Sequence, residues 1–77
     1  GRTAEQLQRA AHTLLQGAGY GHILRIKGFI PDKGGWLELN AARDAMTLQP
    51  IPNGQEVLIV IGEGLDKAAI EAVVKRL

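Results

Sequence analysis

An unbroken apolar run, Val-Leu-Ile-Val-Ile at residues 57–61, passes directly into the segment Gly-Glu-Gly-Leu-Asp at residues 62–66. Five aliphatic residues, four of them β-branched, suit a strand and are too few for a typical helix. Asp66 fits the N-cap of a helix, where its charge is also favourable. Apolar residues follow it at helical spacing: Ile70, Val73, Val74 and Leu77. The sequence therefore predicts a strand, a glycine turn and a helix in this order.

A second helix is predicted near the other end of the sequence. Thr3 and Gln6 have the spacing of a capping box, in which a hydroxyl and an amide satisfy backbone groups reciprocally. Gly17 stands where a left-handed C-cap would end the helix. Between them, apolar residues form one stripe at helical spacing: Leu7, Ala10, Ala11, Leu14 and Leu15.

The residues between the two helices alternate between strand and turn signals. Strands are predicted over residues 22–30, 36–39 and 45–49. The turn at residues 31–35 has a proline and two glycines, residues 40–44 form a loop, and Asn53-Gly54 is the strongest hairpin signal. The predicted fold class is α+β: a two-layer sandwich in the order α-β-β-β-β-α, with a mostly antiparallel four-stranded sheet and both helices on one face.

Alternation along the strands divides the side chains between the two faces of the sheet. The set predicted to face the helices is Leu24, Ile26, Leu37, Leu39, Met46, Leu48, Val57, Ile59 and Ile61. The opposite face receives Ile23, Phe29, Trp36, Leu58 and Val60, mixed with Arg25, Lys27, Glu38 and Thr47. That is much apolar surface for a face exposed to water. A register shift of one residue in any strand would exchange its two faces.

Composition excludes several functional classes. Nine basic and eight acidic residues give a net charge of +1, which provides no long-range attraction to nucleic acid or to an anionic membrane. Cysteine and serine are absent, so the chain has no thiolate metal site and neither of these two nucleophiles. Seventy-seven residues form one small domain, too small for a deep substrate cavity. The absence of disulfides favours a cytoplasmic location.

Three short motifs partly match known binding sites, but the residues around them do not fit those sites. Lys27-Gly28-Phe29 matches only the start of an RNA-recognition strand, because Ile30 and Pro31 then follow. The glycines of residues 17–21 follow a helix and precede a strand, which is the reverse of a dinucleotide-binding loop. The only two histidines, His12 and His22, have no ligand partners at metal-site spacing. No catalytic, cofactor-binding or metal-ligating residue is predicted.

Several segments in this order carry a resemblance to a known family. The strand Leu24–Phe29, with the pattern R-x-K-G, resembles the opening strand of the C-terminal domain of CobW-like proteins. Residues 36–39 look like the next strand of that domain. Residues 57–61, followed by the G-x-x-L-D pattern of residues 62–66, are similar to its closing strand and its turn into the last helix. The loop Ala41–Asp44 departs from the family by lacking aromatic and glycine residues.

The resemblance implies an accessory role. Full-length members of this family are P-loop GTPases linked to metal insertion and cobalamin biosynthesis, with G-x-x-x-x-G-K-[ST] and C-x-C-C motifs in an N-terminal domain. Neither motif occurs here, so GTP, Mg²⁺ and a transition metal are expected only in that N-terminal domain. Residues 1–77 are then a non-catalytic interaction domain of a longer GTPase. Its expected partners are the N-terminal GTPase domain and a client metalloprotein; the alternative is a free-standing regulatory or oligomerisation domain.

The face turned away from the helices is the predicted interaction surface. It combines apolar anchors with cations: Ile23, Arg25, Lys27, Phe29 and Trp36. Tryptophan and arginine are enriched among the residues that dominate binding energy at protein interfaces. The alternative is that Phe29 or Trp36 points inward and that the face is only solvated.

Overall fold

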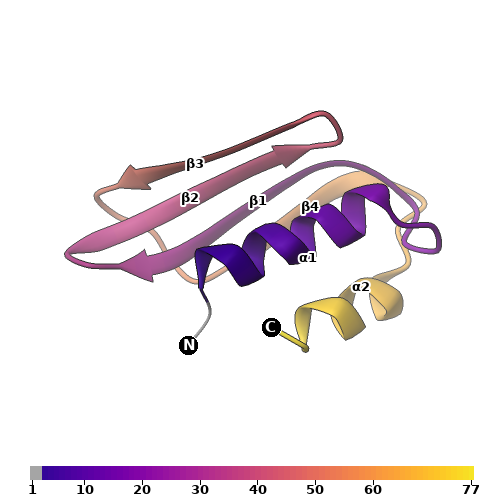
Figure 1. Ribbon diagram of the computed structural model, residues 1–77. Helices are drawn as coiled ribbons and strands as arrows, with labels where there is room; N and C mark the ends of the chain where they lie inside the picture. Colours follow the sequence, from indigo (N-terminus) through magenta and orange to yellow (C-terminus); the bar gives the residue numbers. More distant parts are fainter. Residues whose placement is uncertain (1–2) are drawn as a thin grey trace.

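The computed structural model describes residues 3–77 and contains two helices and one four-stranded sheet (Figure 1). The elements are α1 (Ala4–Gln16), β1 (His22–Asp32), β2 (Gly35–Ala42), β3 (Ala45–Ile51), β4 (Leu58–Glu63) and α2 (Lys67–Val74). Every pair of neighbouring strands is antiparallel, and the strand order across the sheet is β3-β2-β1-β4. The predicted fold class and element order are confirmed.

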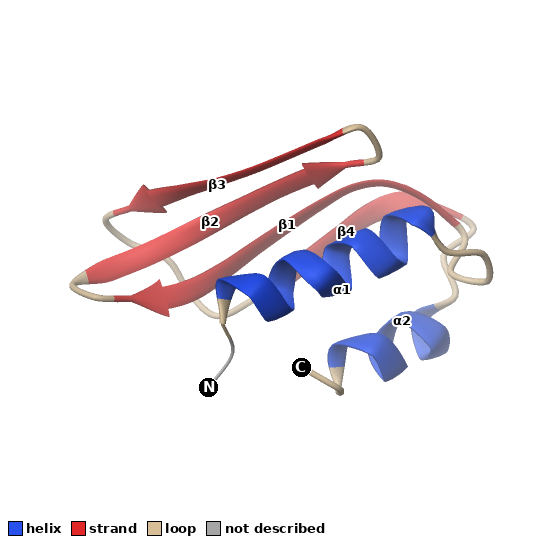
Figure 2. Ribbon diagram, in the orientation of Figure 1, coloured by secondary structure: helices blue, strands red, loops and turns tan. Residues whose placement is uncertain are grey.

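Both helices lie on the same side of the sheet (Figure 2). Helix α1 packs over β1 and β2, and α2 packs against α1. The core between the layers is built from the apolar stripe of α1, the alternate residues of β1 and β2, and one residue of α2: Leu7, Ala11, Leu14, Leu15, Ile23, Ile26, Ile30, Leu39, Ala41 and Ile70. Neither helix covers the other side of the sheet, which the loop between β3 and β4 crosses near Trp36.

The ends of α1 lie where the sequence predicts them. Thr3 and Gln6 form the reciprocal capping box, with a Gln6 N to Thr3 Oγ1 distance of 3.1 Å. The C-cap is Gly17, whose N–H donates to the carbonyl of Thr13, but its φ of −81° is not left-handed. Glycine is needed there for space: a Cβ would lie 2.7 Å from the ring of Tyr20. The left-handed conformation occurs later, at Gly19 and Gly21.

The hairpin predicted from Asn53-Gly54 is wrong, because β3 and β4 lie at opposite edges of the sheet. The two true hairpin turns join β1 to β2 and β2 to β3, and residues 40–42 belong to β2 rather than to a loop. The connection after β3 instead crosses the sheet and brings Gly54 against Trp36, where an added Cβ would lie 3.1 Å from the indole ring. Asn53-Gly54 therefore lies in a loop that crosses the sheet and not in a hairpin turn.

A β-bulge in β1 corrects the predicted faces of Ile23 and Leu24. Ile23 pairs with Gly62 and Arg25 pairs with Ile61, so Leu24 is an extra residue in the ladder. Such an insertion breaks the alternation of side chains along the strand. Ile23, predicted to face outward, is buried in the core at 6% exposure, whereas Leu24, predicted to face inward, is 48% exposed.

The predicted faces of β4 are also reversed. Leu58 and Val60 pack against the core, while Ile59 and Ile61 are 44% and 50% exposed. Both faces of this strand are aliphatic, so alternation alone cannot choose between them. Pairing with β1 decides: Val60 lies opposite the buried Ile26 and therefore shares its face.

The N-cap of α2 gives a testable prediction. The carboxylate of Asp66 accepts a hydrogen bond from the Ala69 N–H at 3.1 Å. Asp66→Ala should lower the free energy of unfolding by about 1 kcal/mol, while Asp66→Asn, which keeps the acceptor, should cost much less. Urea unfolding followed by circular dichroism measures both. Equal losses for the two variants would show that the cap hydrogen bond does not stabilise α2.

Candidate functional site

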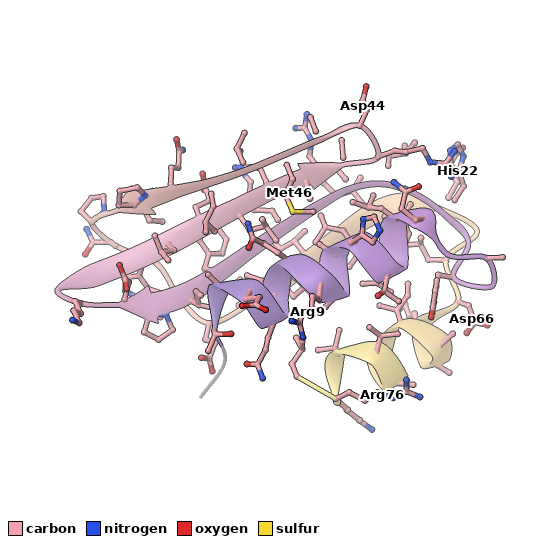
Figure 3. All side chains as sticks on the ribbon, viewed as in Figure 1. Arg9, His22, Asp44, Met46, Asp66 and Arg76 are labelled. Carbon is pink, nitrogen blue, oxygen red and sulfur yellow. The ribbon has the colours of Figure 1, made fainter. Side chains whose placement is uncertain are left out.

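The sheet surface turned away from the helices, called the outer face from here on, carries the exposed aliphatic residues of the molecule. Leu24, Ile59 and Ile61 are each about half exposed and come from the neighbouring strands β1 and β4. The other large exposed hydrophobic residue, Met46, is on the opposite side and reaches from β3 toward α1 (Figure 3). The β1 and β4 half of the outer face is thus an apolar patch. Clustered exposed aliphatic residues of this kind are typical of interaction sites.

Two cations lie within this patch. Arg25 is opposite Ile61 in the sheet register, and Lys27 is opposite Ile59. Among residues 3–77, neither side chain forms a hydrogen bond or an ion pair; the two close charged contacts of the described chain are Arg9 with Glu5 and His22 with Glu63. The positive charges of Arg25 and Lys27 are therefore not compensated inside the fold. Their aliphatic stems extend the apolar surface while the charged ends remain in water.

The β2 and β3 half of the outer face is polar and internally satisfied. Glu38 accepts hydrogen bonds from Asn40 Nδ2 at 3.0 Å and from Gln49 Nε2 at 3.2 Å. These bonds fix the carboxylate of Glu38 within its own strand pair. The outer face therefore differs between its halves: the β1 and β4 half combines aliphatic side chains with two cations, and the β2 and β3 half has a hydrogen-bonded carboxylate and amides next to Trp36 and Ile51.

A hollow of about 330 Å³ lies where these halves meet at one end of the sheet. It is lined by Arg25, Asn40, Ala41, Ala42, Ala45 and Thr47. Arg25 is its only charged lining residue, Asn40 and Thr47 add an amide and a hydroxyl, and the alanines leave the space open. Arg25 connects this hollow to the apolar patch, since it follows Leu24 and pairs with Ile61.

The five predicted interface residues differ in burial. Arg25 is exposed, and Lys27 and Phe29 are half-buried on the outer face. Trp36 is half-buried beneath the crossing loop at Gly54. Ile23 is in the core and leaves the predicted set. The interface role of the other four residues stays a prediction.

Sequence reasoning missed three residues of the patch: Leu24, Ile59 and Ile61. A signal for two of them was available, because the run of residues 57–61 is apolar at every position. Such a run is typical of a strand covered on both faces. In this fold it forms an edge strand with helices on one side only, so one of its aliphatic faces is left in water.

The histidines and carboxylates of the described chain do not gather into a metal site. Among residues 3–77, no three His, Asp or Glu side chains lie close enough to hold a metal ion. His22 is at one end of the molecule, and Asp44 is on the turn between β2 and β3 (Figure 3). His22 has a single charged neighbour, Glu63, at 3.9 Å from Nδ1 to Oε1.

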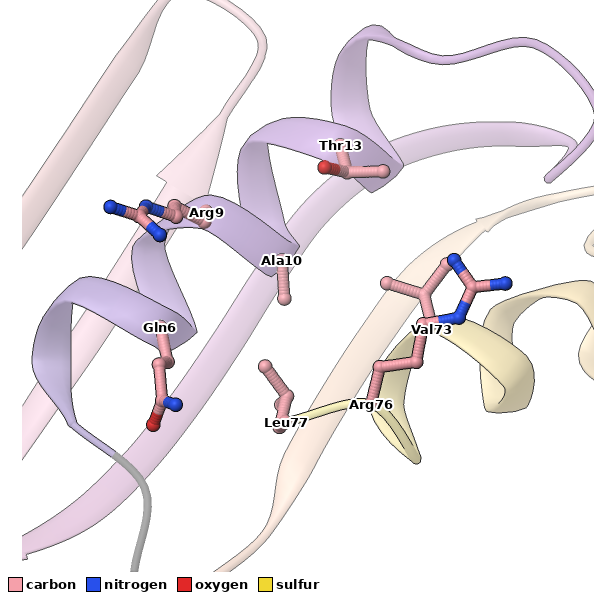
Figure 4. A pocket seen from close by; sticks show the side chains of 7 residues that line it. All are labelled: Gln6, Arg9, Ala10, Thr13, Val73, Arg76 and Leu77. Carbon is pink, nitrogen blue, oxygen red and sulfur yellow. The ribbon is translucent and has the colours of Figure 1, made fainter.

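The helix layer has a groove of its own between α1 and the C-terminal residues, with a volume of about 300 Å³ (Figure 4). Ala10 and Leu77 face one another across it, and the guanidinium of Arg9 turns away to its ion pair with Glu5. Arg76 is the other charged residue of the lining, so the groove does not gather several charged groups around one point. Neither helix, within the described residues, has the length and apolar content required to cross a membrane.

Most residues of the G-x-x-L-D pattern have a structural role. An added Cβ at Gly62 would clash with the His22 carbonyl oxygen, and Gly64 adopts a positive φ of 58°. Leu65 packs against the core, and Asp66 caps α2 and donates its own N–H to the Tyr20 carbonyl at 3.1 Å. These contacts hold the turn after β4 against the loop after α1.

The R-x-K-G pattern divides between structure and surface. Gly28 is buried beneath α1, where an added Cβ would lie 3.1 Å from Leu7 and from Leu58. Arg25 and Lys27, by contrast, have no partner within residues 3–77. Of all the residues in these two patterns, the two cations are the ones that the fold does not explain.

Comparison with protein families decides the assignment. The model of the family described as "Cobalamin synthesis protein cobW C-terminal domain" matches residues 3–77. This chain belongs to that family. The resemblance read from the sequence is thereby confirmed over essentially the whole chain. A comparison with curated proteins and one with solved structures gave no significant match.

Membership in the CobW C-terminal domain family agrees with the site geometry in one respect. One face of its sheet carries no helix, and among residues 3–77 no group of His, Asp or Glu could hold a metal ion. Family membership indicates that the chain is an accessory domain of CobW-like proteins.

Proposed function

We propose that this chain is the protein-binding domain of a CobW-like, GTP-dependent metal chaperone or cobalamin biosynthesis protein of the cytoplasm, and that it binds through the outer face. The observation that carries the proposal is the juxtaposition of Leu24, Ile59 and Ile61 with two uncompensated cations. Apolar side chains in the centre of a contact, with arginine among them, are the composition that dominates binding energy. Family membership supports the accessory role.

The partners that fit this role are the N-terminal GTPase domain of the same protein and a client metalloprotein. In this proposal GTP, Mg²⁺ and the transition metal are bound by the GTPase domain. The present chain contributes affinity and orientation rather than chemistry. Its two-layer structure holds the outer face rigid, because β1 is hydrogen-bonded on both sides and packed beneath α1.

Two substitutions in the full-length protein test the proposal: Arg25→Glu and Phe29→Ser. Each should weaken domain docking or client binding by about 1–3 kcal/mol, a scale typical of important interface residues. Isothermal titration calorimetry of the full-length protein with a client measures the loss of client binding, and titration of the 77-residue chain with the separate GTPase domain measures the loss of docking. Lys75→Glu, at the C-cap of α2 on the helix side, is the matched charge control and should leave binding unchanged.

The opposite result has a clear meaning. If Phe29→Ser unfolds the chain while Arg25→Glu leaves binding unchanged, Phe29 serves the core and the outer face is not the interface. Circular dichroism of each variant separates loss of folding from loss of binding.

A further prediction concerns the nucleotide. The 77 residues contain no G-x-x-x-x-G-K-[ST] loop, which NTPases of this type use to surround the phosphates with backbone N–H groups. Calorimetric titration of this chain with Mg·GTP should therefore give no binding heat. Micromolar binding would contradict the assignment of all nucleotide chemistry to the GTPase domain.

A further inference from the structure

We propose that the hollow beside Arg25 receives a carboxylate side chain of an acidic partner protein, whose apolar side chains cover Leu24, Ile59 and Ile61. This inference rests on the proposed function and specifies the chemistry of the partner. It concerns one end of the outer face, where the hollow of about 330 Å³ adjoins the apolar patch.

The lining of the hollow suits a carboxylate. Its single charged group is the guanidinium of Arg25, which has no ion pair within residues 3–77. Guanidinium and carboxylate groups match as a two-bond fork, and such charge-assisted pairs are stronger than neutral hydrogen bonds. Thr47 lines the same hollow and adds a hydroxyl that can donate to a carboxylate oxygen, while the amide of Asn40 already donates to Glu38.

Charge argues against a second copy of this chain as the occupant. A two-fold contact places the same patch of each copy against the other. Arg25 and Lys27 of the two copies would then face one another across an apolar surface with their charges unpaired. Glu38 lies opposite Phe29 in the register, is hydrogen-bonded to Asn40 and Gln49, and forms no ion pair with either cation within residues 3–77. An acidic partner turns the same two cations into favourable contacts.

Lys27 extends the complementarity along the strand. It lies two residues beyond Arg25 in β1 and opposite the exposed Ile59. Arg25 and Lys27 form one row along β1, and Ile61 and Ile59 form the neighbouring row along β4. A partner segment that presents acidic and apolar side chains side by side on one of its faces therefore meets both rows.

The test uses the folded 77-residue chain and two synthetic peptides. One peptide repeats Glu-Glu-Leu-Leu between glycine ends, so that each face of the extended chain presents both residue types, and the other replaces each glutamate with glutamine. Amide chemical shifts are followed by NMR as each peptide is added. The glutamate peptide should shift the amides of Arg25, Thr47 and Ile61 and should bind about tenfold more tightly than the glutamine peptide.

Arg25→Gln is the decisive variant, and Lys75→Gln is its matched control on the helix side. Arg25→Gln should abolish the preference for glutamate, while Lys75→Gln should retain it. Equal binding of both peptides to the unaltered chain, no binding of either, or a preference that survives Arg25→Gln would each overturn the carboxylate site. The amide chemical shifts of the chain alone should not change with its concentration. If they do change, a second copy of the chain occupies the outer face, and the carboxylate site is overturned.

Failure here is distinguishable from failure of the proposed function. If the peptides show no preference but Arg25→Glu still weakens binding of the GTPase domain, the outer face is an interface and only the carboxylate chemistry is wrong. If neither experiment shows an effect, both the proposed function and this inference are wrong.

Discussion

Replacing Leu39 by alanine should lower the free energy of unfolding by about 2–5 kcal/mol, the range found when buried leucines are truncated. Leu39 has 0% exposure, lies opposite Gly28 in the sheet, and belongs to the core beneath α1. A domain of this size has a total stability of roughly 4–12 kcal/mol, so the substitution removes a large part of it. Urea unfolding followed by circular dichroism measures the change.

Leu24→Ala is the matched control for Leu39→Ala. The two substitutions remove the same number of side-chain atoms, but the side chain of Leu24 is 48% exposed because of the bulge in β1. Its loss should be below about 1 kcal/mol, since a half-exposed side chain leaves no cavity. Equal losses for the two leucines would show that Leu24 faces inward as simple alternation predicts, and that the bulge is not formed in solution.

The second large effect is expected at Gly21. Its φ is +92°, and an added Cβ would lie 2.8 Å from the Cα of Leu65 and closer still to the Gly64 carbonyl. Gly21→Ala combines backbone strain of about 1–3 kcal/mol with an overpacking cost of similar size. The loop after α1 and the turn after β4 would have to separate. Thermal unfolding should show a large fall in melting temperature.

Gly19 provides a control with nearly the same backbone. Its φ is +94°, but an added Cβ would have no atom within 4 Å. Gly19→Ala should therefore show only the strain of about 1–3 kcal/mol. If Gly19→Ala and Gly21→Ala destabilise the chain equally, the close contact between these two turns does not contribute to stability.

The helices and the fold class were predictable because their signals are local. The capping box at Thr3 and the N-cap at Asp66 each involve residues three positions apart, and both form as predicted. The apolar stripe of α1 also faces the core as its spacing indicates. Hydrogen bonds and packing within a single helix need no knowledge of the rest of the chain.

The faces of the strands were harder because they depend on pairing between distant residues. Asn53-Gly54 has the composition of a hairpin turn, yet it lies in the loop that carries the chain from β3 at one edge to β4 at the other. The bulge at Leu24 arises from the pairing of β1 with β4, more than thirty residues later in the sequence. No local pattern contains this information.

The candidate site was accordingly predictable only in part. Arg25 and Lys27 were placed on the outer face correctly, because two charged residues in alternation cannot both be buried without partners. Leu24, Ile59 and Ile61 were assigned to the core, since aliphatic residues at alternating positions are ordinarily inside. Their exposure is a consequence of strand order and of the bulge, and it gives the outer face its apolar half.

The central claim is that a partner protein covers the outer face, and isoleucine methyl groups report on this directly. A soluble paramagnetic agent broadens the NMR signals of methyl groups exposed to water. In the chain alone, Ile59 and Ile61 should broaden strongly and the buried Ile26 should not. When the proposed partner, the GTPase domain of a CobW-like protein, is added, Ile59 and Ile61 should become protected. If they remain as exposed as before while the two proteins are demonstrably bound, the outer face is not the binding surface.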